Sequence, residues 1–148
     1  MDFIGEYEID HKVTDNLLNF FISKLPLAQV GEVGGGLVDK SIKDSLDLRI
    51  CPSNLPSELV DYASELNKSV KKYTNTFPYA DKHQHYWGVR ENIQLQYYAP
   101  GGGFKLFHYE NSGKGESLWR HLVFMTYLNT IPPEEGGGTE FLYQRSFN

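Results

Sequence analysis

The stretch that decides the fold spans residues 93–110 and reads IQLQYYAPGGGFKLFHYE. On both sides of its central glycines lie short runs rich in aromatic and aliphatic residues, which is typical of β-strands joined by a turn. We therefore predict strands over residues 93–98 and 104–109. Similar short runs follow at residues 122–128 and 139–143, so the C-terminal half of the chain is predicted to be β-rich.

The N-terminal half carries helical patterns instead. One apolar face begins near Thr14, where Thr14 or Asp15 can cap the first free N–H groups, and Pro26 is expected to end this helix. The face consists of Leu17, Leu18, Phe21, Ile22 and Leu25. A second helix is predicted after Pro56, because apolar residues recur there at a spacing that keeps one stripe against a core. This stripe consists of Leu59, Ala63, Leu66, Val70 and Tyr73.

The segment between the two helices is rich in glycine and ends in an alternating pattern. Leu46, Leu48 and Ile50 predict a half-buried strand at its end. A length of 148 residues fits one domain. We therefore expect a single α+β domain, in which residues 1–80 form a helical or mixed support region and residues 81–148 form the β core.

Composition and charge exclude several classes of partner. The net charge of −5 and a pI near 5.5 leave no basic field that would gather nucleic acid or anionic lipid. A single cysteine, Cys51, cannot form an internal disulfide, and the acidic start lacks the apolar region of a secretion signal. No apolar run approaches the roughly 18 residues of a membrane span. We expect a soluble, cytoplasmic protein.

The candidate for chemistry is the pair His108 and Glu110. Two positions apart on a strand, their side chains leave from the same face. An imidazole and a carboxylate supply two thirds of the two-histidine, one-carboxylate set that binds iron(II) and leaves its opposite face open. By itself this spacing is a weak signal, because a half-exposed strand carries polar residues on its wet face in any case.

Other histidines could complete such a set. His121 and Tyr127 are an even number of residues apart, so on one strand their side chains would leave from the same face. His121 is therefore one candidate for a third ligand. His83 and His85 form a second possible pair, although their polar neighbours favour an exposed loop. His11 is expected at the surface.

The order of motifs around His108 supports the metal interpretation. A tyrosine and glycine segment, Tyr97 to Gly103, precedes it, and Arg120, Tyr127-Leu128-Asn129 and the segment from Gly136 to Phe141 follow it. Over about residues 93–143 this order resembles the iron(II)- and 2-oxoglutarate-dependent oxygenases of the prolyl 4-hydroxylase type. That family places a tyrosine and glycine loop before His-x-Asp, then an arginine, Tyr-Leu-Asn and Gly-Gly-x-Thr-x-Phe.

The resemblance implies a fold and a set of roles. The fold is a double-stranded β-helix, or jelly roll, with the metal at one open end and residues 81–148 as its first half. His108 and Glu110 would be metal ligands, and Tyr127 would donate a hydrogen bond to the distal carboxylate of 2-oxoglutarate. Tyr98 would flank this co-substrate, and Phe104 would wall the pocket. Without the resemblance, both tyrosines are ordinary core residues with a wet tip.

Arg120 is open to two interpretations. It can orient an anion or the metal-binding loop, either by lying near the substrate or by contacting a metal ligand. An arginine at the start of a strand is more often a solvated or salt-bridged surface residue.

The reaction that the resemblance implies is hydroxylation of a prolyl or other C–H substrate, with release of succinate and CO2. Iron(II), 2-oxoglutarate and O2 would be required, and ascorbate is a further candidate cofactor. The substrate class, peptide or small molecule, stays open, as does the oligomeric state. Glu110 stands where the family usually has aspartate. The second histidine, the basic residue for 2-oxoglutarate and the C-terminal strands are expected beyond Asn148.

Two other functions fit the same residues. A non-catalytic jelly-roll binding module would use the aromatic excess as a groove for carbohydrate or peptide, and it would bind no iron. A cupin-like metalloenzyme on a related barrel would bind metal without forming succinate.

Overall fold

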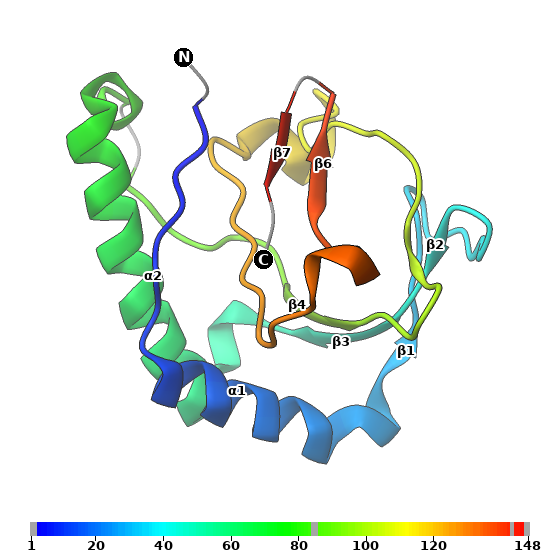
Figure 1. The fold of residues 1–148 in the computed structure, drawn as a ribbon. Helices are drawn as coiled ribbons and strands as arrows, with labels where there is room; N and C mark the ends of the chain where they lie inside the picture. Colours follow the sequence, from blue (N-terminus) through cyan, green and yellow to red (C-terminus); the bar gives the residue numbers. More distant parts are fainter. Residues whose placement is uncertain (1–2, 84–85, 143, 147–148) are drawn as a thin grey trace. The chain divides into compact units, whose positions relative to one another are not determined.

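The computed structural model describes residues 3–83, 86–142 and 144–146. The chain divides into two compact units, the first made of Met1–Lys24 with Arg49–Ile93 and the second of Leu25–Leu48 with Gln94–Asn148. Over the described residues the fold is α+β, with two α-helices and three small sheets (Figure 1). The predicted fold class is therefore confirmed at this level.

Helix α1 (His11–Lys24) belongs to the first unit and begins earlier than predicted. Its cap is Asp10, whose Oδ1 accepts a hydrogen bond from Lys12 N at 2.9 Å. The predicted cap at Thr14 or Asp15 is wrong, because the Thr14 hydroxyl donates to the His11 carbonyl from inside the first turn. An aspartate just before the helix satisfies N–H groups that no helical carbonyl can reach.

Helix α2 (Ser57–Thr76) confirms the second predicted helix and contacts α1 within the first unit. Leu59 and Tyr62 are buried on α2, as are Leu17 and Phe21 on α1. Leu17 and Leu59 are almost fully excluded from water, which stabilises each by about 1.5–3 kcal/mol relative to exposure. None of the helices in the described ranges is both long and apolar enough to span a membrane.

The strands form three small sheets (Figure 1). The three-stranded sheet has the order β1 (Gln29–Val30), β3 (Leu46–Ile50) and β4 (Ile93–Tyr97). The other two are antiparallel pairs, β2 (Lys43–Asp44) with β5 (Gly103–Phe104) and β6 (Thr139–Phe141) with β7 (Gln144–Ser146). The strands predicted near residues 46, 93 and 139 are confirmed.

Two other predicted strands are wrong. The run 104–109 is a strand only at its first residue, and among the described residues no strand covers 122–128. Pairing of β2 with β5 ends in one further hydrogen bond, from Lys105 N to Ile42 O at 2.7 Å. Beyond it the run pairs with no strand in the described part of the chain, and an aromatic run alone does not make a strand. No jelly-roll barrel is formed by the described part of the chain.

A buried polar cluster occupies β2 and β3. Lys43, Ser45 and Asp47 alternate along the chain and are each 3–5% exposed. Lys43 Nζ lies 2.6 Å from Asp47 Oδ2, and Ser45 Oγ donates to Asp47 Oδ1 at 2.7 Å. The predicted apolar face is half-buried at Leu46 and Leu48, so the polar face of this segment is the more deeply buried one. It can be buried because each charge has a partner.

Candidate functional site

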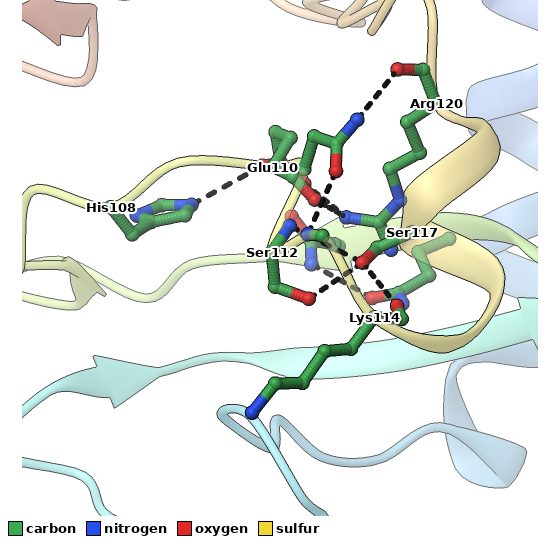
Figure 2. A network of polar contacts seen from close by, with 10 residues as sticks. His108, Glu110, Ser112, Lys114, Ser117 and Arg120 are labelled. Carbon is green, nitrogen blue, oxygen red and sulfur yellow. Dashed lines mark hydrogen bonds and ion pairs between the residues drawn. The ribbon is translucent and has the colours of Figure 1, made fainter.

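His108 and Glu110 come together although they do not lie on a strand. Nε2 of His108 lies 3.2 Å from Oε1 of Glu110 (Figure 2). Their side chains are 41% and 45% exposed, so a ligand can reach both. The two side chains meet as predicted. Irregular backbone brings them together, and not the shared face of a strand.

The imidazole of His108 is fixed on two sides. Its Nδ1 lies 2.9 Å from the carbonyl oxygen of Leu106. Because a carbonyl only accepts, Nδ1 carries the hydrogen in this contact. The ring of Phe104 stacks on the imidazole, with centroids 4.1 Å apart and planes 16° from parallel. These contacts direct Nε2 toward Glu110.

The 3.2 Å separation of Nε2 and Oε1 is that of a hydrogen bond or ion pair, and two ligands of one cation would lie at a similar distance. With Nδ1–H committed to Leu106, a neutral His108 presents a lone pair to the carboxylate, and two acceptors repel each other. A proton on Nε2 or a metal ion between the two atoms removes this repulsion. Neighbouring ligands on an octahedral ion with bonds of about 2.1 Å are about 3.0 Å apart, close to the observed distance.

A third ligand is not found in this arrangement. Among residues 3–83, 86–142 and 144–146, no three His, Cys, Asp or Glu side chains gather as a metal site. His121 is exposed and belongs to no such group within these ranges. His83 lies in a loop of the first unit, as predicted, but it is half-buried and edge-on to Trp87, with ring centroids 4.6 Å apart. His85 lies outside the described residues, whereas His11 is exposed as predicted.

Arg120 lies at the site and is salt-bridged. Its Nη1 donates to Oε2 of Glu110 and to the main-chain oxygen of Glu110, both at 2.7 Å. Metal-binding carboxylates in proteins are commonly hydrogen-bonded in this way by a neighbouring group. The interpretation of Arg120 as a salt-bridged residue is confirmed, whereas a role in orienting an anion or the metal-binding loop stays a prediction.

Tyr127 forms a separate contact within the second unit. Its hydroxyl is hydrogen-bonded to the Thr139 hydroxyl, which donates to the Met125 sulfur at 3.1 Å. Since a thioether only accepts, the Thr139 oxygen is left to accept the Tyr127 proton. A carboxylate ligand would have to replace Thr139 as the acceptor. No contact described for Tyr127 joins it to His108.

Tyr98 lies beside the buried polar cluster. Burial and the nearby charge of Asp47 raise the pKa of Tyr98 to about 12. A hydrogen bond with Ser45 acts in the opposite direction and lowers it in part. Its hydroxyl also donates to Gln96 at 3.2 Å. A neutral phenol over the whole physiological range can donate a hydrogen bond, which is what the expected role beside a carboxylate ligand requires.

The sequence analysis missed the part of the site that Lys43 contributes. Its Nζ lies 5.9 Å from the centroid of Phe104, the ring that stacks on His108. This distance is within the range of a cation–π contact. The alternation of Lys43, Ser45 and Asp47 was the available signal, because these residues lie on the face opposite Leu46 and Leu48.

Comparison with known proteins gives no relative. No protein-family model matches the chain, and no curated protein or solved structure matches it either.

Proposed function

We propose that the chain carries the iron-binding part of an iron(II)- and 2-oxoglutarate-dependent dioxygenase of the prolyl 4-hydroxylase type. The observation that carries the proposal is the pair of His108 Nε2 and Glu110 Oε1, 3.2 Å apart and directed at each other. The order of motifs over residues 93–143 supports it. The reaction would hydroxylate a prolyl or other C–H substrate and release succinate and CO2.

Each residue of the site has a defined part in this proposal. Bound iron would supply the oxidising chemistry, as cofactors do in general. His108 and Glu110 would hold the ion, and Phe104 would keep the imidazole plane fixed through its stacking contact. Tyr127 would donate its proton to the distal carboxylate of 2-oxoglutarate in exchange for Thr139. Tyr98, whose phenol keeps its proton and can donate a hydrogen bond, would flank the same ligand.

The finer fold belongs to the same proposal. We infer a double-stranded β-helix, in which β4, β5 and β6 are strands of the first half. Iron binding of this type also requires a second histidine and a basic residue for 2-oxoglutarate, neither of which is supplied by His108 and Glu110.

The test is iron binding in the absence of oxygen. Iron(II) with 2-oxoglutarate should give a visible charge-transfer band, which His108→Ala should abolish. His121→Ala is the matched control, because it removes an exposed histidine that no described metal group includes. If the 148-residue chain gives no such band, the proposal is wrong.

One observation favours the non-catalytic binding module as second candidate. Aromatic side chains close in sequence to His108 are strongly exposed, with Phe107 at 58%, Tyr109 at 77% and Trp119 at 59%. Exposed aromatic side chains suit carbohydrate or peptide recognition. This candidate predicts ligand binding that is the same with and without iron. A cupin-like metalloenzyme would bind metal but form no succinate, and this distinguishes it from the dioxygenase.

A further inference from the structure

Residues 3–10, which we call the strap, run beside α2 in the first unit and form neither helix nor strand (Figure 1). The Tyr73 hydroxyl of α2 donates a hydrogen bond to the carbonyl oxygen of Phe3 at 2.9 Å, across 70 positions of the chain. The ring of Phe3 lies against that of Phe77, with centroids 5.4 Å apart, and the Tyr73 and Phe77 centroids are 4.8 Å apart. An aromatic anchor therefore fixes one end of the strap to the C-terminal end of α2.

The other end of the strap faces a basic part of α2. The pKa of Lys68 is raised mainly by its hydrogen bond and ion pair with Glu65, and in smaller part by the charge of Asp10. The strap and α2 thus run antiparallel, with Phe3 at Phe77 and Asp10 near Lys68. Further charged residues have the same signs, namely Glu6 and Glu8 in the strap and Lys71 and Lys72 on α2. The strap is acidic where this part of α2 is basic.

Tyr7 shapes the middle of the strap. A Cβ at Gly5 would lie 2.5 Å from the Tyr7 hydroxyl oxygen and 2.7 Å from its ring, so the phenol folds back over the strap's own backbone. Burial raises the pKa of Tyr73, and the nearby Tyr7 phenol raises it further. The strap therefore directs two aromatic side chains, Phe3 and Tyr7, toward the region of Tyr73.

Few buried contacts hold the strap. Phe3 is 69% exposed, and no residue from 3 to 10 is buried. In the described part of the chain, no strand ladder includes the strap. Helix α2, in contrast, contacts α1 and buries Leu59 and Tyr62. Segments with few buried apolar contacts open at a much lower free energy than the core, so the strap can leave α2 while the helix stays folded.

We propose that the face of α2 formed by Lys68, Tyr73 and Phe77 recognises peptides, and that the strap occupies it as a ligand would. The partner it fits is a protein with an extended acidic segment that carries two aromatic residues spaced as Phe3 and Tyr7 are. The contacts of the strap define this chemistry: a phenyl ring on Phe77, a carbonyl oxygen for the Tyr73 hydroxyl and a carboxylate near Lys68. Another segment can supply all three. The face contains neither His108 nor Glu110, so it is independent of iron binding.

The experiment measures binding of a fluorescein-labelled peptide with the strap sequence, FIGEYEID, to the full 148-residue chain by fluorescence anisotropy. The strap of the native chain competes with the peptide, so apparent affinity is reduced by the fraction of molecules in which the face is open. In Phe3→Ala/Tyr7→Ala the strap loses its anchors, and the peptide should bind at least about tenfold tighter than to the native chain. Equal affinity of the two proteins, or no binding by either, would overturn the proposal.

Variants of α2 locate the peptide. In the Phe3→Ala/Tyr7→Ala background, Tyr73→Phe removes the hydroxyl that donates to the strap and should weaken peptide binding by about three- to tenfold. Tyr79→Phe is the matched control, because Tyr79 is 88% exposed and its hydroxyl has no described contact with the strap. If the two substitutions have the same effect, the peptide binds elsewhere and the assignment of the face is wrong.

The peptide itself tests the chemistry of recognition. Alanine in place of its phenylalanine should abolish measurable binding, because the aromatic anchor is lost. Amides in place of its three acids should weaken binding and remove most of its dependence on salt. A scrambled peptide of the same composition that binds equally well would show unspecific adhesion and contradict the proposal.

Two measurements on the native chain do not depend on the folding of a variant. A large excess of the peptide should shift the amide NMR signals of residues 4–9 toward those of the free peptide, because the strap is displaced. Signals that stay unchanged would make the strap a fixed part of the fold and overturn the proposal. Sedimentation should show a monomer, whereas a dimer that is lost in Phe3→Ala/Tyr7→Ala would assign the face to a second copy in place of a separate partner.

Discussion

Two ion pairs in the second unit have almost the same length and very different surroundings. Lys43 and Asp47 approach to 2.6 Å with side chains 4% and 1% exposed. Arg120 and Glu110 approach to 2.7 Å with side chains 32% and 45% exposed. Judged by distance alone, the two ion pairs would be equally strong. However, the attraction between the charges and the energetic cost of removing one partner both rise steeply with burial.

Burial decides what each pair can do. The buried pair has further partners, with Ser45 on the second oxygen of Asp47, and no route by which a ligand could take its place. The exposed pair leaves Glu110 Oε1 beside a histidine and open to solvent. The first pair therefore holds the fold, while the second is available for chemistry.

The largest effect is expected when the buried pair is broken. Lys43→Met should lower the free energy of unfolding by about 3–5 kcal/mol, because Asp47 keeps a buried charge without its partner. Urea unfolding followed by circular dichroism measures this. Lys40→Met is the matched control, since the Lys40–Asp44 pair at 3.4 Å is 66% and 42% exposed. The double change Lys43→Met with Asp47→Leu should recover most of the loss.

A smaller loss is expected from crowding the same cluster. In Gly31→Ala the new Cβ would lie 2.1 Å from Ser45 Oγ, so the hydroxyl must leave its bond to Asp47 or the backbone must shift. We expect about 1–3 kcal/mol of destabilisation in the same urea assay. Gly34→Ala meets nothing within 4 Å and provides the comparison. If Gly31→Ala and Gly34→Ala are equally stable, the cluster can accommodate the additional methyl group.

The exposed pair should matter little for stability. Arg120→Gln is expected to change the free energy of unfolding by less than about 1 kcal/mol, because solvent screens the pair. A loss as large as that of Lys43→Met would remove the distinction between the two pairs.

The smallest effect is a shift in the titration of Tyr98. Its pKa is raised from 10.0 to about 12, so one phenol should ionise about two pH units late in the near-ultraviolet phenolate absorbance. The neutral form is the one favoured by folding. Its contribution to stability is therefore full below pH 10 and is lost as the pH rises to about 12. Tyr98→Phe should remove the late step, and its persistence would assign it to another tyrosine.

Local patterns in the sequence were sufficient for some parts of this molecule. The apolar spacing of α2 and the alternation of β4 predicted both elements, because each depends on neighbouring residues. Residues 104–109 show the limit, since a strand also needs a partner elsewhere in the chain. Which side of residues 43–47 is buried depends on the Lys43–Asp47 pair, and hydrophobicity alone gives the opposite answer.

The same distinction applies to the site. His108 and Glu110 were predicted together because they are two residues apart. Arg120 reaches Glu110 across ten residues through a loop closed by its own side chains, and no periodic pattern signals such a path. The contact of Lys43 with Phe104 depends on the register of β2 with β5, which the sequence does not state.

The closure of the 111–120 loop at its base has a consequence for insertions. Asn111 joins the ends of the loop, while the tip carries Gly113 and Gly115 with φ of +70° and +55° and exposed neighbours. Doubling the length of a flexible loop costs only about 0.6 kcal/mol of closure entropy. New sequence, such as an affinity tag or a reporter peptide, can therefore be placed at the tip while the base keeps Arg120 on Glu110.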